Sequence, residues 1–319
     1  MIDVDFITVT NGDISIEVAT KGAGPLVVFV HGWPELWYSW RHQIEHVAAR
    51  GHRAAALNVR GYGGSSNPIE IERYTLRELT SDVAAVIDAL GGGSGVLVGH
   101  DWGAPIAWNT ARLHPDKVRA VMGMSVPYVP VGPTSLIELF EQVYADRFFY
   151  QLYFQEPGVA EAELGADHAR SLRMIYYGAS GQGAGTFVAD KPADAKLLDG
   201  MVDPDPLPTF VTAADLATYA AAYATSGWHG PINRYRAQGL DAADIGQIEG
   251  GELDQPAAFV GGELDVVRRF MPGMDLFDLA PANCRDFRGS TIVPGAGHWV
   301  QQEAPAETNA ALDRFLDSL

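Results

Sequence analysis

Basic residues, cysteines and long apolar runs are all scarce in this sequence of 319 residues, and each scarcity excludes a class of protein. Lys and Arg number 22 against 40 Asp and Glu, which gives a formal net charge of −18 at pH 7. Binding to nucleic acid or to an anionic membrane needs clustered cations, so we expect neither partner. The single cysteine, Cys284, allows no intrachain disulfide and is compatible with a reducing compartment.

Signals for membrane insertion or export are also missing. No apolar stretch reaches the roughly 18 residues that a transmembrane helix requires. Residues 1–5, MIDVD, are acidic and are not a basic segment followed by an apolar run, so we expect no signal peptide. These features favour a cytoplasmic protein. Apolar residues make up 47% of the chain and charged residues 19%, which suits a folded protein with a sizeable core.

The first third of the chain alternates short apolar runs with helical patterns. The predicted strands are 6–10, 14–18, 26–30, 54–59, 95–98 and 118–125, and the predicted helices are 37–50, 75–90 and 104–113. Asn11-Gly12 between the first two strands favours a hairpin turn. Runs that are apolar on both faces suit strands of a buried parallel sheet. Alternating strands and helices therefore predict an α/β fold, with a mostly parallel central sheet covered by helices on both faces.

The pattern changes after Pro127, where closely spaced prolines indicate an exit from the sheet. From about residue 135 to 235 we predict helices and no strands. The predicted helices are 136–153, 160–177 and 213–224, strands return at 257–260 and 291–293, and a last helix covers 304–316. Thr212 and Asp215 have the spacing of a capping box. We therefore predict a core domain in two parts, 1–132 and 244–319, interrupted by an inserted helical cap domain at 133–243.

The segment Gly99-His100-Asp101-Trp102-Gly103 has the strand–turn–helix context of a nucleophile elbow. Its small outer residues allow a tight turn that exposes the central side chain, which here is Asp101. A carboxylate is a poor nucleophile toward a carbonyl, but it can displace a leaving group at saturated carbon and form an alkyl ester. Epoxides and alkyl halides are such substrates. Capping of the next helix is the structural alternative for Asp101.

An acid and a histidine follow the nucleophile in the expected chain order. Asp265 comes shortly after the run 257–260, and His298 comes shortly after the run 291–293, so both lie where strands end in loops. In this arrangement His298 would activate a water as general base, and Asp265 would orient the imidazole as its charge partner. Glu263 competes with Asp265 for the second role, and Asp254 is a weaker rival.

The turn His31-Gly32-Trp33-Pro34 follows the first predicted core strand. One backbone donor of an oxyanion hole is expected from this region, and a second from the residue after the nucleophile. We therefore predict that the backbone N–H groups of Trp33 and Trp102 form the oxyanion hole.

Nearly the whole chain resembles the epoxide hydrolases of the α/β-hydrolase superfamily, of the soluble microbial type without an extra N-terminal domain. The matching segments are HGWPELWYSWRHQ at 31–43, RGYGGSS at 60–66, GHDWGAPIAW at 99–108, FYQLYFQEPGVAEAEL at 149–164, SGWHGPINRYR at 226–236, GGELDVV at 261–267 and GAGHWVQQEAP at 295–305. Many hydrolases share the first and last segments, so the two segments from the cap discriminate. Asn58 is a departure, since family members often have Asp there, and we expect it to change only local hydrogen bonding.

The resemblance implies two cap tyrosines, Tyr150 and Tyr235, that activate the epoxide oxygen. A phenol is protonated at neutral pH and can donate to the oxygen that leaves the ring carbon. Tyr153 and Tyr128 are nearby alternatives. The predicted function is thus an epoxide hydrolase that converts a small apolar epoxide and water to a vicinal diol. We expect no metal or organic cofactor, and a homodimer is typical of the family.

Two other interpretations remain open, a dehalogenase and a non-catalytic binder, whereas a zinc site is dismissed. A haloalkane or haloacid dehalogenase would use the same nucleophile, and the Trp102 indole suits a halide, but the second donor is often an Asn where this chain has Trp33. Fluoroacetate dehalogenases have Arg where this chain has Trp102. A non-catalytic small-molecule binder on a hydrolase scaffold usually lacks a triad member. The segment 42–46, HQIEH, matches an H-x-x-E-H zinc motif, yet no third ligand is evident in the sequence.

Overall fold

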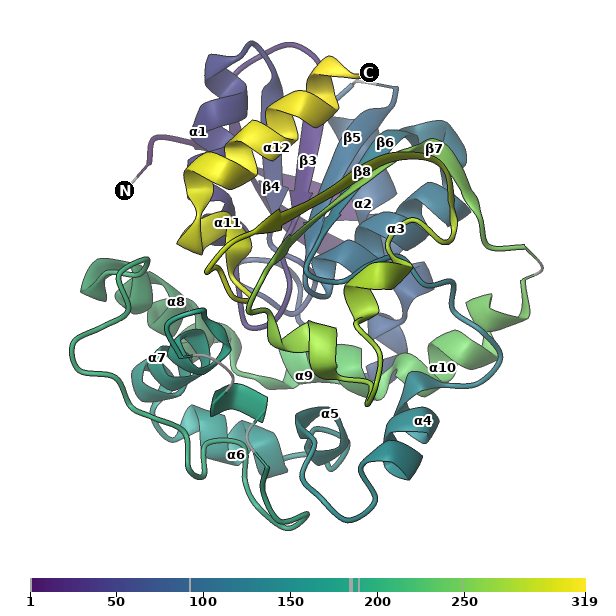
Figure 1. Cartoon of the computed structure of the whole chain (residues 1–319). Coiled ribbons are helices and arrows are strands. Elements are labelled where there is room, and N and C mark those ends of the chain that lie inside the picture. The colour runs from purple at the N-terminus through teal and green to yellow at the C-terminus, as the bar shows by residue number, and fades with distance from the viewer. Residues whose placement is uncertain (1, 92, 184–185, 189, 249) are drawn as a thin grey trace.

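The central feature of the computed structural model is an eight-stranded sheet (Figure 1). The structure describes residues 2–91, 93–183, 186–188, 190–248 and 250–319. The strands are β1 (Asp5–Asn11), β2 (Ile14–Lys21), β3 (Leu26–Val30), β4 (Arg53–Leu57), β5 (Gly95–His100), β6 (Val118–Met124), β7 (Leu253–Gly262) and β8 (Cys284–Val293). Their order is β1-β2-β4-β3-β5-β6-β7-β8, and β2 pairs antiparallel with β1 and β4 while the other pairs are parallel. The mostly parallel α/β fold predicted from the sequence is confirmed.

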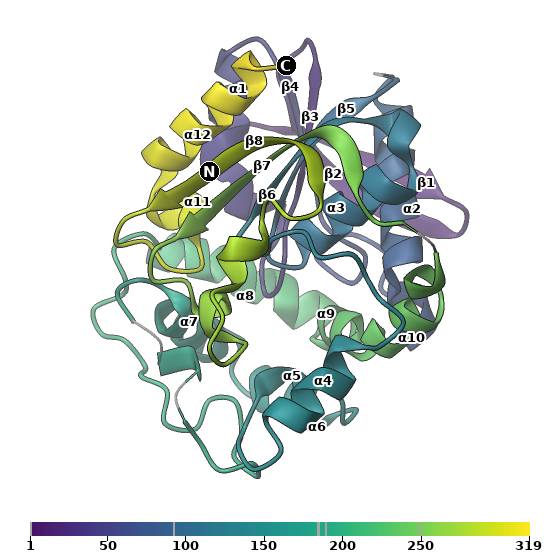
Figure 2. The same ribbon diagram turned by 45° about the vertical axis from the view of Figure 1, so that its right-hand side comes forward.

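Helices cover both faces of this sheet (Figures 1 and 2). On one face lie α1 (Arg41–Ala49), α11 (Val300–Glu303) and α12 (Pro305–Asp317), and on the other α2 (Leu76–Ala89) and α3 (Gly103–Leu113). Every residue of β3 and of β5 is buried, because each strand has helices above and below it. The continuous apolar runs of these strands are therefore the sequence pattern of a two-sided core.

Between β6 and β7 the described residues form helices and no strand. These helices are α4 (Leu136–Val143), α5 (Tyr150–Tyr153), α6 (Val159–Gly165), α7 (His168–Ala179), α8 (Ala213–Ser226), α9 (His229–Arg236) and α10 (Gln238–Ala243). They lie along one end of the sheet, below it in Figure 1. The exact division into core and cap at residues 133 and 243 stays a prediction. None of the helices in the described ranges is long and apolar enough to cross a membrane.

The sequence predicted the cap as helical but misjudged where its helices break. The predicted helix 136–153 is two helices, and Phe149 between them has an extended backbone. Tertiary contacts cause this break, because the Phe148 N–H donates to the Lys191 carbonyl and the Phe149 ring stacks on Tyr144 at 4.2 Å. The predicted helix 160–177 also divides, because Asp167 caps the new helix α7 through the Arg170 N–H.

The edge strand β8 is longer than its predicted range of 291–293, since it begins at Cys284. Much of this strand is exposed, so polar residues alternate irregularly along it and conceal it from a search for apolar runs. Cys284 lies in a polar stretch of sequence, yet its side chain is buried, and burial raises the pKa of its thiol to about 11. The thiol is therefore protonated and unreactive at neutral pH.

Candidate active site

The turn between β5 and α3 holds Asp101 in a left-handed backbone conformation with φ of 49°. A residue other than glycine adopts this conformation only where the surroundings impose it, and such strain is typical of a nucleophile elbow. The turn is tight because α3 starts against β3. A Cβ added at Gly103 would lie only 1.9 Å from the Val30 carbonyl oxygen. The elbow thus directs the Asp101 carboxylate away from its own helix, toward the end of the sheet.

Each oxygen of the Asp101 carboxylate has a different partner. Oδ1 accepts a hydrogen bond of 2.7 Å from the Trp33 backbone N–H. Oδ2 lies 3.3 Å from Nε2 of His298. The close approach to Trp33 requires glycine before it, because a Cβ at Gly32 would be 2.3 Å from Asp101 Oδ1. In the described part of the chain no hydrogen bond joins the Trp102 N–H to this carboxylate, so its role as second oxyanion donor stays a prediction.

His298 and Asp265 meet beside Asp101. His298 Nδ1 is 3.0 Å from Asp265 Oδ1, and both side chains are buried. Asp265 is fixed in turn by the Val267 N–H, which donates to its Oδ1 at 3.0 Å. Burial by itself lowers the pKa of His298, but the charge of Asp265 and the hydrogen bonds to both aspartates raise that pKa well above its ordinary value. The structure therefore brings the three predicted residues into one chain, in the order Asp101, His298, Asp265.

The two rival acids have other contacts. Glu263 is exposed, and its Oε2 accepts the Gly295 N–H at 3.0 Å. Asp254 pairs at the surface with Arg285 at 2.7 Å. Only Asp265 among the three candidates contacts the imidazole.

The two cap tyrosines pack against each other in a cavity that Asp101 also lines. Tyr150 begins α5 and Tyr235 lies near the end of α9, and their ring centroids are 5.7 Å apart. The Tyr150 hydroxyl accepts a hydrogen bond of 3.0 Å from Nε2 of Gln151. The Tyr235 hydroxyl is buried and forms no hydrogen bond of ordinary geometry with the described protein groups, although an interaction with Tyr150 perturbs the pKa of both phenols. Burial, assisted by the negative charge of Asp101, raises the pKa of both phenols. Both are therefore protonated and able to donate at neutral pH.

The alternative tyrosines are engaged elsewhere. The Tyr153 hydroxyl donates to Glu163 at 2.9 Å. The Tyr128 hydroxyl donates to the Gly251 carbonyl at 2.6 Å. Neither hydroxyl points its hydrogen toward Asp101, so the geometry favours the pair that the resemblance implied.

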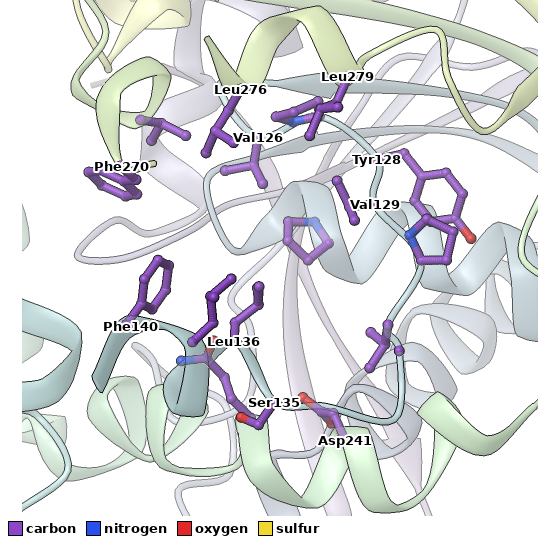
Figure 3. Close-up of a pocket in the computed structure, with 18 of the residues that line it drawn as sticks. Val126, Tyr128, Val129, Ser135, Leu136, Phe140, Asp241, Phe270, Leu276 and Leu279 are labelled. Carbon is purple, nitrogen blue, oxygen red and sulfur yellow. The ribbon is translucent and has the colours of Figure 1, made fainter. Parts of the chain in front are cut away.

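Two cavities of very different size are both lined by Asp101. The smaller has a volume of about 20 Å³, and it is lined by Asp101, His298, both cap tyrosines and a ring of apolar side chains. The larger has a volume of about 410 Å³ and extends from Asp101 and Tyr150 beneath the loop 126–134 (Figure 3). In Figure 3 its apolar side chains surround an open centre, with Phe140 and Leu136 opposite Val126 and Leu276. Such a volume is ordinary for a small-molecule site.

Three polar residues that support the site were present in the matching segments but received no role from the sequence. Glu35 is fully buried and accepts from His100 Nδ1 at 2.7 Å, while His100 Nε2 lies 2.7 Å from the His298 carbonyl. Burial tends to raise the pKa of Glu35, but the charge and hydrogen bond of His100 hold it below its ordinary value. What sets such residues apart is a polar side chain buried among apolar ones. A single sequence does not show which of its polar residues are buried.

Glu303 and Gln151 are the other two polar residues that support the site. The Glu303 carboxylate accepts the backbone N–H groups of Gly297 and Trp299, each at 3.0 Å, on either side of the histidine. Gln151 orients the Tyr150 hydroxyl, and Oε1 of Gln151 accepts from Gln238 at 3.1 Å. A phenol oxygen that accepts this bond turns its own hydrogen toward the cavity.

Asn58, the departure from the family pattern, lies buried outside the triad. Its Oδ1 accepts the Trp37 N–H at 2.9 Å, and its Nδ2 donates to Glu17 Oε2 at 2.5 Å. An aspartate could make the first contact but not the second.

Within the described residues no cluster of three or more His, Cys, Asp or Glu is arranged to hold a metal ion, and His46 of the HQIEH segment contacts Asp313 at 2.7 Å.

Comparisons with known proteins place this geometry in a known context. Residues 25–305 match the family model described as the alpha/beta hydrolase fold. Epoxide hydrolase A of Mycobacterium tuberculosis is 38% identical over 312 residues, covering 95% of this chain and 94% of that protein. An epoxide hydrolase from an endophytic Streptomyces has a solved structure with a TM-score of 0.93 and 40% identity, covering 98% of this chain and 95% of the other. The crystal structure of Epoxide Hydrolase A from Mycobacterium thermoresistibile gives a TM-score of 0.91 at 39% identity, and the match covers 99% of this chain and 98% of the other.

Proposed function

Because the chain belongs to the α/β-hydrolase family, and within it to the epoxide hydrolases, we propose that it converts an epoxide to a vicinal diol through a covalent ester on Asp101. One observation above all supports this route. A single strained carboxylate lies 3.3 Å from a buried imidazole and shares a cavity with two buried phenols. Nucleophile, base and acid for both half-reactions are thus present on one chain.

In the first half-reaction Asp101 attacks a ring carbon with Oδ2, the oxygen that the Trp33 N–H does not hold. A bond forms between Oδ2 and that carbon while the carbon–oxygen bond of the ring breaks. Negative charge grows on the leaving oxygen, and Tyr150 and Tyr235 donate hydrogen bonds to it and supply a proton. The product is a hydroxyalkyl ester whose carbonyl oxygen is Oδ1.

In the second half-reaction His298 removes a proton from a water, and that water attacks the ester carbonyl carbon. The negative charge on Oδ1 is stabilised by the Trp33 N–H, with the Trp102 N–H as the predicted second donor. Ester formation itself prepares the base, because it removes the Asp101 charge that helps to raise the pKa of His298. Cleavage of the bond from Cγ to Oδ2 releases the diol, whose oxygen Oδ2 takes the proton held by His298. The carboxyl group left on Asp101 then loses its proton, which returns to the phenolate through solvent.

Oxygen labelling in a single turnover tests this route. Excess enzyme is mixed with an aryl epoxide in water enriched in oxygen-18, and the diol is analysed by mass spectrometry. The ester route takes the new diol oxygen from Asp101, so the first diol is unlabelled and the label appears in the peptide that contains residue 101. A fully labelled first diol would mean direct attack by water and would refute the covalent route.

The dehalogenase alternative shares Asp101 and His298, but a halide needs no proton. Two phenols facing the nucleophile favour a leaving group that must be protonated, as an epoxide oxygen must. The homodimer and the cytoplasmic location remain predictions from the sequence and the resemblance.

A further inference from the structure

We infer that the preferred substrate is a terminal epoxide, with one bulky, neutral, apolar arm on one ring carbon and only hydrogens on the other. This inference rests on the proposed function and specifies the substrate of that site. It follows from the unequal cavities on the two sides of the nucleophile, about 410 Å³ and about 20 Å³.

The ring itself must lie where the two cavities meet. Asp101 and Tyr150 line both cavities, whereas Tyr235 and His298 line only the smaller one. An epoxide whose oxygen faces both phenols therefore fills much of the smaller cavity. A space of about 20 Å³ holds on the order of one water molecule, so no room is left beside the ring for a second substituent.

Packed side chains close the far side of the smaller cavity. Ile175 of α7 is fully buried there, and Phe187 packs edge-on against Tyr150 with ring centroids 5.1 Å apart. The wall also includes Ala179, whose carbonyl accepts the His298 N–H at 2.9 Å. Because this wall is tied to the catalytic base, it cannot recede without moving His298.

The larger cavity receives the arm. Its rim is apolar and open to solvent, since Val129, Leu136 and Met274 all line it and are about half exposed, at 49%, 52% and 50%. Large apolar side chains that remain exposed around a hollow are typical of an entrance for an apolar ligand. Val129 and Leu136 lie on opposite sides of the pocket in Figure 3.

Charge in the larger cavity argues for a neutral arm. None of the described residues lining it is Lys, Arg or His. Of its two acids, Asp101 is the nucleophile, and Asp241 is paired with Arg234 and accepts the Leu76 N–H. An ionised carboxylate on the arm would be buried without a partner, at a large desolvation cost.

Initial rates for isomeric substrates test the inference. We expect kcat/KM for 1,2-epoxyoctane to exceed that for trans-2,3-epoxyoctane by about tenfold or more, because one misplaced methyl group in a closed pocket has an effect of that order. From 1,2-epoxybutane to 1,2-epoxyoctane, kcat/KM should rise about fourfold per methylene. The methyl ester of 7,8-epoxyoctanoic acid should react at least about tenfold faster than the free acid.

Three test variants and two control variants locate the cause. Ile175→Ala and Phe187→Leu enlarge the smaller cavity and should reduce the preference for the terminal isomer about tenfold, and either variant suffices if the other fails to fold. Ile245→Ala, equally buried but outside both cavities, should leave the preference unchanged. Leu139→Trp fills part of the larger cavity and should abolish the rise in kcat/KM with arm length. Leu240→Trp, on exposed surface outside both cavities, should leave that rise unchanged.

The possible failures are distinguishable. Equal kcat/KM for the two isomers, or an unchanged preference in folded Ile175→Ala and Phe187→Leu, would overturn the inference. If His298→Gln still formed an ester with both isomers in that case, the proposed function would stand. If no epoxide formed an ester, the proposed function and this inference would fall together.

Discussion

Replacing Tyr235 by Phe should make the protein more stable and the enzyme slower. The Tyr235 hydroxyl is buried and forms no hydrogen bond of ordinary geometry with the described protein groups, its weak interaction with Tyr150 aside. Its ring packs against Trp102 and Tyr150, with centroids 5.4 and 5.7 Å away, and a phenylalanine ring preserves those contacts. The substitution therefore removes one polar atom and little else.

The stability gain can be estimated from the cost of that atom. A buried polar group without a partner costs about 1–3 kcal/mol. Since a bound water can satisfy part of this in the free enzyme, we expect the free energy of unfolding to rise by about 1 kcal/mol. For a chain of this size that corresponds to a melting temperature about 2 °C higher.

The loss of activity comes from the transition state. A hydrogen bond to a charged group contributes about 1.5–3 kcal/mol, so removing one donor from the departing oxygen should lower kcat/KM about 10- to 150-fold. Thermal unfolding and initial rates on an aryl epoxide, measured on the same preparation, give both quantities. The double variant that also replaces Tyr150 by Phe should show almost no ring opening.

Tyr150→Phe is the matched control. It removes the acceptor that the Gln151 side chain uses at 3.0 Å, and that amide is nearly buried, so this variant should lose about 1 kcal/mol of stability while also losing activity. We therefore expect Tyr235→Phe to raise the free energy of unfolding and Tyr150→Phe to lower it. Both variants should lose kcat/KM to a similar extent. A Tyr235→Phe enzyme that is less stable than wild type, or that keeps full kcat/KM, would refute the reasoning.

Three further predictions concern the polar groups around the site. Asp265→Asn removes a charge that raises the pKa of His298. Ester hydrolysis should therefore slow about 10³- to 10⁴-fold, and the acid limb of its pH profile should move to lower pH. An acid limb that does not move would contradict the pairing of Asp265 with His298. Gln151→Leu should slow ring opening about tenfold in single-turnover kinetics with little change in ester hydrolysis, and equal effects on both steps would exclude an orienting role. Asn58→Asp would set a carboxylate against Glu17, whose Oε2 lies 2.5 Å from the amide nitrogen of Asn58. Chemical denaturation should show a free energy of unfolding lower by about 1–3 kcal/mol at pH 8, with a smaller loss at pH 5. A loss of stability that does not depend on pH would argue against this contact.

The sequence predicted those parts of the molecule that local chemistry determines. Asp101 could be found because an elbow needs small residues around an exposed nucleophile, between a strand and a helix. Asp265 and His298 could be found because loops after parallel strands meet at one end of the sheet. The two tyrosines required the family resemblance, since aromatic residues in a helical cap ordinarily only pack.

The parts that the sequence did not reveal depend on contacts between distant segments. The break before Tyr150 comes from ring stacking and from a backbone bond to Lys191, neither of which leaves a local pattern. Glu35 supports the site through a histidine 65 residues away in sequence. The unequal cavities likewise result from side chains of α4, α7 and the loop 126–134, and no single segment encodes their volume.

The most direct test of the account is the intact mass of His298→Gln after incubation with an aryl epoxide, with a terminal bromoalkane in parallel. Loss of the base should stall hydrolysis and trap the ester. The account predicts an adduct with the full mass of the epoxide on the peptide that contains Asp101, and no adduct in the His298→Gln, Asp101→Ala double variant. An adduct from the bromoalkane alone, or no adduct from either compound, would contradict it.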